Sequence, residues 1–349
     1  MVSMIGIASA SPSDLMSSTD PLRELNIPLF EIKDIHGKGK GLITHFNISR
    51  GTCILCEKPL IIAQHKLHED LELLLAAKLK AMLRTSQSQF LSLHNNFPGR
   101  YPFSGIVKTN ALPCGSSSIV SGVYPTACLI NHSCIPNTHN SWNSREGHET
   151  IHAIRPIKSR TKITISYDHG GPSGVRQRFL KESFSFACTC SGYTLTPSFL
   201  KASDNRRNIY IYISQIQRLD EAIGDPFHMM NHPHESLQDC YSLFRVLEQE
   251  FNRHAGALVA RLYYDAFQIC IAHKDQARSS IFAERAYKAR VICEGEDSPD
   301  TLCMKSLASQ PADHSSFGVC SNKWQTTRES IPKGLDMLQF DKWLFRQEG

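Results

Sequence analysis

The main change in the hydrophobic pattern of the chain lies near Pro197, and it divides the predicted fold into two parts. Before it, short β-rich runs such as LFEIKDI and TCILCEKPLII are separated by glycine-rich turns, a pattern typical of small β-sheets. After it, apolar residues recur at helical spacing, in stripes such as Leu237, Cys240, Phe244 and Leu247. The sequence therefore predicts an α+β protein whose β-rich domain precedes an all-α domain.

One segment of the β-rich part has helical spacing. Its apolar residues fall on one helical face, and they are Leu71, Leu74, Leu75, Leu79 and Met82. We therefore expect a helical insertion at about 66–100. The expected order is a loose lead-in at 1–28, the β domain at 29–168, a short segment at 169–197 and the helical domain at 198–349.

The helical domain contains AERAYKARVICEGEDSPDT, which is similar to one helix of a tetratricopeptide hairpin. No clean repeat of about 34 residues accompanies it. A helical bundle packed on the β domain is therefore predicted, and a groove that holds a protein partner is the alternative.

Composition excludes several classes of function. The net charge of the 349 residues is +5, but lysines and arginines are scattered, so we expect no direct binding to nucleic acid. No run approaches the roughly 18 apolar residues that span a bilayer, and the first residues lack the basic region of a signal peptide. Twelve cysteines without such a signal predict reduced thiols in the cytoplasm or nucleus.

The stretch LINHSCIPN places His132 and Cys134 two residues apart. A nucleophilic cysteine with a histidine base is one hypothesis, but a thiol protease also needs a third, orienting group, and no protease context is visible. A metal site is favoured, because FACTC supplies Cys188 and Cys190 as further thiolates. Only three of the four ligands that structural zinc requires are then visible.

A second cysteine pair, Cys53 and Cys56, lies in an apolar run that is expected to form a strand. Residues three apart in a strand face opposite ways. These two cysteines are therefore interpreted as buried structural thiols.

The order of five motifs, KGKGLI, GTCILCEKPL, LINHSCIPN, ITISY and FSFACTC, resembles the SET-domain protein methyltransferases. The resemblance covers roughly residues 29–193. It is most similar to small fungal proteins related to the SET-and-MYND branch, but no cysteine-rich MYND finger is present. The resemblance implies a fold of short sheets in which the Asn-His-Ser-Cys and Tyr segments form a pseudoknot, an exception to the usual unthreaded topology.

This resemblance also implies an activity. It implies an S-adenosylmethionine-dependent protein-lysine N-methyltransferase that acts on the lysine side chain of a histone or non-histone protein. The alternative is a non-catalytic SET-fold module that holds a partner on its helical domain. Fold alone does not decide between these two functions.

Roles for single residues follow from the same resemblance. Tyr167 and Tyr124 are the implied catalytic or channel residues. Phe186 is expected to stack on the adenine of the cofactor. The implied cofactor-binding residues are Lys38, Gly39, Lys40, Gly41, Asn110, Asn131, His132, Tyr167 and Phe186.

Two departures from the family pattern concern the metal and a loop. The zinc ligands implied by the resemblance are Cys134, Cys188 and Cys190, but Tyr193 stands where a fourth cysteine is usual. The zinc is then either absent or completed by a distant thiol such as Cys240. The segment 159–162, Ser-Arg-Thr-Lys, replaces an acidic Gly-Glu-Glu pattern.

Overall fold

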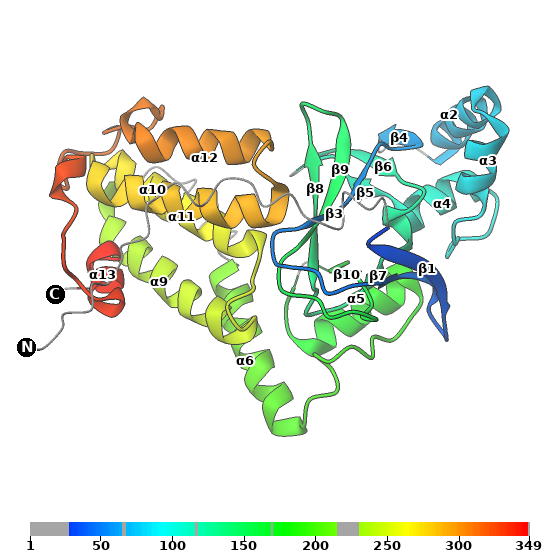
Figure 1. Cartoon of the computed structure of the whole chain (residues 1–349), viewed down its shortest axis with the longest axis horizontal. Coiled ribbons are helices and arrows are strands. Elements are labelled where there is room, and N and C mark those ends of the chain that lie inside the picture. The colour runs from blue at the N-terminus through cyan, green and yellow to red at the C-terminus, as the bar shows by residue number, and fades with distance from the viewer. Residues whose placement is uncertain (1–27, 65–67, 116–117, 169, 215–229, 348–349) are drawn as a thin grey trace, which may run out of the picture.

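The computed structural model describes residues 28–64, 68–115, 118–168, 170–214 and 230–347, so the lead-in predicted at 1–28 lies almost entirely outside them. A part built of short sheets and a part built of helices lie side by side (Figure 1). The predicted α+β organisation is therefore confirmed. No helix in the described ranges is long and apolar enough to cross a membrane.

The first two strands form a hairpin over a glycine-rich turn. Strand β1 (Phe30–Ile35) pairs antiparallel with β2 (Gly39–Thr44). The turn requires two residues with positive φ, and Gly37 (68°) and Gly39 (65°) supply them, because a residue without Cβ adopts this conformation without strain.

Two three-stranded antiparallel sheets follow. One has the order β3 (Cys53–Glu57), β9 (His148–Ala153), β8 (Thr138–Asn143). The other has the order β4 (Ile61–Gln64), β6 (Val120–Val123), β5 (Leu112–Pro113). The first of these sheets contributes to an apolar interior whose buried members include Leu42, Ile130, Ile151, Ile163 and Ile165.

A short parallel pair joins two distant motifs. Strand β7 (Asn131–His132) follows the 3-10 turn η2 (Ala127–Leu129) and pairs with β10 (Thr164–Ile165). Ser133 N–H extends the pair by donating to the Ile165 carbonyl at 2.9 Å. The Asn-His-Ser-Cys and Ile-Ser-Tyr segments therefore lie side by side.

The insertion consists of α2 (His68–Ala81), α3 (Arg84–Leu91) and α4 (Pro102–Asn110), so its helices continue past the expected end near residue 100. They pack on β4 and β6 through a separate apolar cluster. That cluster includes Leu71, Leu75, Leu79 and Phe90, which confirms the predicted apolar face.

Two helices lead from the sheets to the helical part. Helix α5 (Ser173–Phe184) precedes the Cys-x-Cys segment, and α6 (Pro197–Ser214) follows it. The further helices within the described ranges are α9 (Pro233–Glu250), α10 (Ala257–Ala272), α11 (Gln276–Glu294), α12 (Pro299–Ser309) and α13 (Met337–Leu344). Two 3-10 turns, η3 (Pro311–Asp313) and η4 (Arg328–Ser330), connect the last of them.

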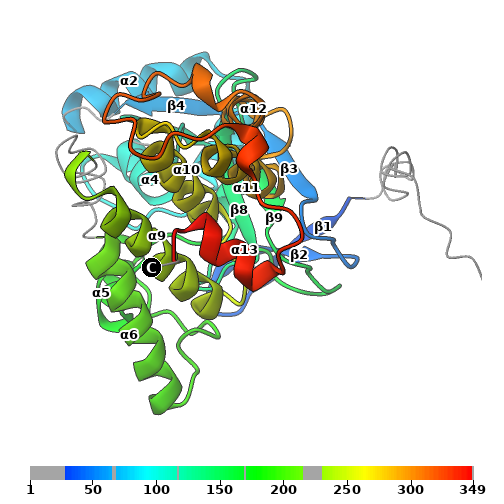
Figure 2. The same cartoon turned by 90° about the vertical axis from the view of Figure 1, so that its left-hand side faces the viewer.

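The helical part has its own apolar core, formed mainly by α9, α10 and α11 (Figure 2). Leu237, Cys240, Phe244 and Leu247 are all buried in it, as the stripe on α9 predicted. Helix α11 also packs against β8 and β9, and Asn143 Nδ2 donates to Asp297 Oδ2 at 3.3 Å just beyond that helix.

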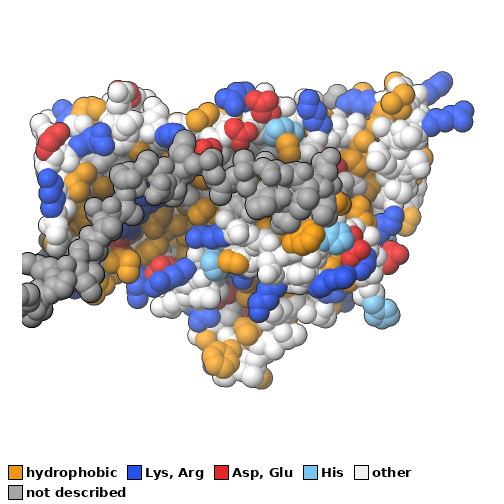
Figure 3. Space-filling view, viewed as in Figure 1, with side chains coloured by type: hydrophobic (Ala, Val, Ile, Leu, Met, Phe, Trp, Pro, Cys, Tyr) orange, Lys and Arg blue, Asp and Glu red, His pale blue; other side chains and the backbone are white. Residues whose placement is uncertain are grey.

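Basic side chains are interspersed with acidic and apolar ones on the face that Figure 3 presents.

Candidate methyltransferase site

The imidazole of His132 is the centre of the site. Its position is fixed because Tyr167 N–H donates to His132 Nδ1 at 2.9 Å across the β7–β10 pair. Since Nδ1 accepts, the neutral ring carries its proton on Nε2. Burial lowers the pKa of His132, which favours this neutral form.

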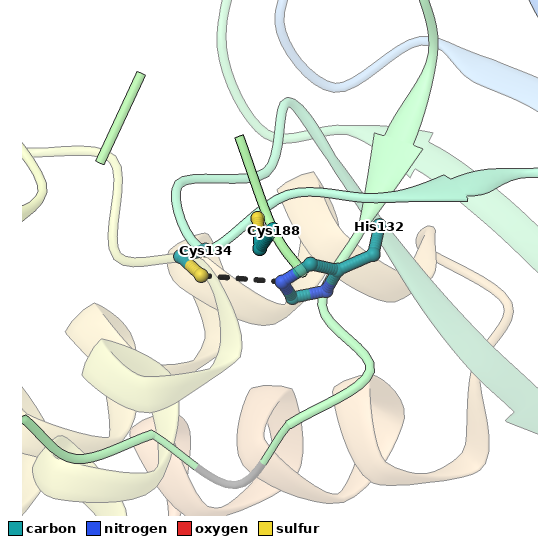
Figure 4. Close-up of side chains that lie close together, drawn as sticks. All are labelled: His132, Cys134 and Cys188. Atoms are coloured by element: carbon teal, nitrogen blue, oxygen red, sulfur yellow. Dashed lines mark hydrogen bonds between the residues drawn. The ribbon is translucent and has the colours of Figure 1, made fainter. Parts of the chain in front are cut away.

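The Nε2 side of the ring faces sulfur and carboxylate. Nε2 lies 3.2 Å from Cys134 Sγ, as the dashed line in Figure 4 marks, and 3.5 Å from Asp168 Oδ2. Both ring nitrogens of His132 therefore have hydrogen-bonding partners. A buried histidine held in this way positions its neighbours rather than attacking a substrate.

Tyr167 lies in an aromatic pocket directly after β10. Its hydroxyl donates to the Ile130 carbonyl at 2.5 Å, and its ring centroid is 4.8 Å from that of Phe184 and 6.5 Å from that of Phe186. Burial raises the pKa of Tyr167. The hydroxyl therefore stays protonated and fixed in orientation at neutral pH.

We call the turn at Lys38–Gly41 together with Asn131 the cofactor edge. Asn131 Nδ2 donates to the Lys40 carbonyl at 2.8 Å, so the turn and β7 are joined. Asn131 Oδ1 is buried without a hydrogen-bond partner among the described residues, and such atoms normally find one. A Cβ on Gly41 would lie 3.0 Å from this oxygen. A polar group that approaches closely would fit this edge.

Phe186 and Asn110 lie at different distances from this centre. The Phe186 ring centroid is 6.1 Å from that of His132. Asn110 ends α4, and its Nδ2 donates to the His94 and Ile106 carbonyls at 2.7 and 2.8 Å. Phe186 is therefore part of the group, whereas the Asn110 amide donors are occupied by its own segment and its cofactor role stays a prediction.

Tyr124 belongs to the apolar cluster of the sheet interior, against which Tyr167 also packs. It is fully buried in the sheet interior, where its hydroxyl donates to Glu149 Oε2 at 3.4 Å and lies 3.9 Å from Cys114 Sγ. Burial raises the pKa of Glu149 to about 7. This arrangement is that of a core tyrosine, and a role in the channel stays a prediction without geometric support.

The three predicted thiol ligands converge, and we call them the cysteine cluster. Cys134 N–H points to Cys190 Sγ at 3.4 Å, and Cys190 N–H to Cys188 Sγ at 3.4 Å. Ligand atoms of His132, Cys134 and Cys188 lie within 4.8 Å of one another. Hydrogen bonds among the thiols raise the pKa of Cys134 and lower that of Cys190. The cluster therefore has the donor chemistry of a zinc site.

Tyr193 contributes no ligand atom to this cluster. Its hydroxyl donates to the Ser173 carbonyl at 2.8 Å, and its ring lies 5.1 Å from the Arg176 guanidinium carbon. The prediction that Cys240 could supply the fourth thiol is wrong, because Cys240 is buried in the separate core of the helical part.

The interpretation of Cys56 as a buried thiol is also wrong, since Cys56 is exposed on β3.

The Ser-Arg-Thr-Lys segment has its own partners near the first hairpin. Ser159 Oγ donates to the His45 carbonyl at 2.7 Å, and Arg160 lies 3.5 Å from Glu31 at the surface. These contacts hold the segment beside β2. An exposed pair of this kind adds little stability.

Two residues of the site were missed by sequence reasoning. Asp168 directly follows Tyr167, and its side chain is only 3% exposed. Arg207 on α6 is buried, and it donates to the Cys134 carbonyl at 2.9 Å and to Glu250 Oε1 at 2.6 Å. The only sequence signal for Asp168 is its position beside the motif tyrosine. No sequence signal points to Arg207.

Comparisons with known proteins agree with this geometry. The SET domain family model matches residues 39–168. The histone-lysine N-methyltransferase set5 of Schizosaccharomyces pombe is 31% identical over 289 residues, which cover 82% of this chain and 85% of that protein. The chain therefore belongs to the SET-domain family of S-adenosylmethionine-dependent protein-lysine methyltransferases.

A relative of the SET-and-MYND branch matches only a short part of the chain, whereas a solved SET domain with low sequence identity covers most of it. The histone-lysine N-methyltransferase SMYD3 of Mus musculus is 36% identical over 70 residues, which cover 20% of this chain and 16% of that protein. The crystal structure of the SET domain of LSMT bound to lysine and AdoHcy covers 87% of this chain and 92% of its own, with 12% identity and a TM-score of 0.33. The relation to the SET-and-MYND proteins is thus confined to a short part of the chain.

Proposed function

We propose that this chain transfers methyl groups from S-adenosylmethionine to lysine side chains of a protein, and that a histone is its substrate. The observation that carries the proposal is the link between His132 and Tyr167 beside the unpartnered Asn131 oxygen. The name of the fission yeast relative, a histone-lysine methyltransferase, supports the choice of a histone.

The cofactor edge and Phe186 would hold S-adenosylmethionine, which supplies a methyl group on a sulfonium. The unpartnered Asn131 Oδ1 fits a donor on the cofactor. Gly41 leaves room for close approach, since a side chain there would contact both Asn131 and Ile35. Phe186 offers an aromatic face beside His132.

The substrate lysine must lose its proton before transfer. At an ordinary pKa of about 10.4, this costs about 4.6 kcal/mol at pH 7. Apolar surroundings lower that cost by disfavouring the charged amine, and Tyr167, Phe184 and Phe186 supply such surroundings. A separate general base is therefore not needed, and the protonated Tyr167 hydroxyl orients the reacting groups.

We also propose that the cysteine cluster binds zinc. Its three thiols converge from the segment after β7 and from the Cys-x-Cys segment. Zinc there would fix the segment that carries Phe186 against His132. Metal loss would then loosen one wall of the site.

Location and partners follow from the proposed substrate. Histones are made in the cytoplasm and act in the nucleus, so we propose residence in either compartment. A protein partner on the helical part remains a proposal beside the lysine substrate.

The test is transfer of labelled methyl groups into purified histones and into a protein lysate. Tyr167→Phe should reduce transfer by roughly 100-fold or more, the usual cost of removing one oriented donor, while the chain stays folded and loses only about 1–3 kcal/mol of stability, because the Ile130 carbonyl loses its donor. Tyr287→Phe is the matched control, because this tyrosine is partly buried in the helical core. Unchanged turnover in Tyr167→Phe would refute the role of its hydroxyl. Cofactor binding without any labelled protein would favour the non-catalytic interaction module.

A further inference from the structure

The cysteine cluster lacks a fourth thiol, but a carboxylate points at it. Asp168 Oδ2 lies 3.7 Å from Cys134 Sγ. Asp168 Oδ1 accepts from Gly170 N–H at 2.8 Å, which fixes the orientation of the group. One oxygen is thus anchored to the backbone, and the other lies near both Cys134 Sγ and, at 3.5 Å, His132 Nε2.

The distance between this oxygen and Cys134 suits a shared metal. Zinc binds thiolate sulfur at about 2.3 Å and carboxylate oxygen at about 2.0–2.2 Å, so tetrahedral ligands of these types lie about 3.6 Å apart. The observed 3.7 Å agrees with that spacing.

His132 is the other nearby candidate, and its hydrogen bonding argues against it. A zinc-bound Nε2 must be free of its proton, which would move to Nδ1. Nδ1 already accepts from Tyr167 N–H at 2.9 Å, so two protons would then point at each other. Coordination by His132 would break the contact that joins β7 to Tyr167.

The charges around Asp168 also fit a bound cation. Its side chain is 3% exposed, and a buried carboxylate requires a partner of opposite charge or several hydrogen bonds. Three thiolates and a carboxylate carry more negative charge than zinc neutralises. Arg176, 1% exposed and near Tyr193, supplies further positive charge, and its Nε and Nη2 have no hydrogen-bond partner among the described residues.

We propose that Asp168 is the fourth zinc ligand of this chain and replaces the cysteine that the family places at Tyr193. This inference rests on the proposed zinc site. The ligand set is Cys134, Cys188, Cys190 and Asp168. Because Asp168 directly follows Tyr167, the metal would hold the strand end that carries the catalytic hydroxyl, a link that a cysteine at residue 193 would not provide.

The experiment measures metal affinity on the full chain, with zinc competition against a chromophoric chelator and cobalt substitution as readouts. Asp168→Asn should weaken zinc binding by more than the roughly 100-fold that loss of an outer-shell partner costs. Asp168→Cys should retain the metal and shift the cobalt spectrum toward that of a four-sulfur site. Glu149→Gln removes another buried carboxylate and should leave the affinity unchanged.

Each of three outcomes would refute a different part of this proposal. A wild-type chain that binds neither zinc nor cobalt would refute the zinc site itself. Equal zinc affinity in wild type and Asp168→Asn would refute the role of Asp168 while the site stands. His132 would be the fourth ligand if His132→Gln weakened zinc binding and removed the cobalt–nitrogen features of the spectrum, while Asp168→Asn bound zinc like the wild type.

Discussion

The two sides of the His132 ring differ in how closely they keep the family pattern. On the Nδ1 side, the turn at Lys38–Gly41, Asn131 and Tyr167 match the residues that the resemblance implies, and the buried Asn131 Oδ1 has no hydrogen-bond partner within the part of the chain that the structure describes. On the Nε2 side, Tyr193 has replaced a cysteine and satisfies its hydroxyl at Ser173. Where the motif residues are present, a polar atom such as Asn131 Oδ1 is available to a ligand. Where Tyr193 stands in place of a cysteine, the proposed metal ligand comes from Asp168, a residue outside the Cys-x-Cys motif.

The largest effect is expected from the buried cation that supports the cysteine cluster. Arg207→Met should lower the free energy of unfolding by about 3 kcal/mol or more, because it removes the hydrogen bonds of a buried guanidinium to Glu250 and to the Cys134 carbonyl, each worth about 1.5–3 kcal/mol. Chemical denaturation measures the change.

Arg206→Met is the matched control for this prediction. Arg206 lies 2.9 Å from the same carboxylate, but its side chain is 30% exposed, so its removal should cost about 1 kcal/mol or less. Equal losses in the two variants would contradict the larger contribution that burial gives to Arg207.

The second prediction concerns the pH dependence of stability, which depends on Glu149 in the sheet interior and not on the methyltransferase site. The folded-state pKa of Glu149 is about 7, above its ordinary value of 4.5, because of burial. The folded chain therefore holds a proton that the unfolded chain has released, and stability falls as pH rises from about 4.5 to about 7. At about 1.36 kcal/mol per unit, the loss approaches 3 kcal/mol.

Glu149→Gln should remove this loss and raise the free energy of unfolding at pH 8 by up to about 3 kcal/mol. Methyl transfer should not change, since Tyr124 and Glu149 lie in the sheet interior. Denaturant unfolding from pH 4 to 8 measures the slope, and exposed Glu146→Gln is the control. A large loss of transfer would support the channel role that the resemblance implies for Tyr124, the hydrogen-bond partner of Glu149.

Local motifs predicted the cofactor edge better than they predicted its surroundings. Glycines at positive φ and the pairing of His132 with Tyr167 follow from short motifs with strict backbone demands. The channel role of Tyr124, which only the resemblance implies, stays a prediction, because a motif does not fix the direction in which a side chain outside it points.

Long-range contacts were beyond the sequence for a physical reason. Arg207 reaches the Cys134 carbonyl across 73 positions of the chain, and no periodicity encodes such a contact. Asp168 is adjacent to a motif residue, but its role depends on which way its carboxylate turns. Only the folded backbone, through Gly170 N–H, determines that orientation.

The most direct test of the central claim is a calorimetric titration of S-adenosylmethionine into wild-type chain and Gly41→Ala. A Cβ at residue 41 would lie 2.9 Å from Ile35 Cγ1 and 3.0 Å from Asn131 Oδ1, and such overpacking costs about 1–3 kcal/mol. The account predicts one site in the wild type and roughly 5- to 150-fold weaker binding in the variant. Gly99→Ala, where no atom lies within 4 Å of an added Cβ, should bind like the wild type. Equal affinity in Gly41→Ala, or no binding to the wild type, would contradict the account.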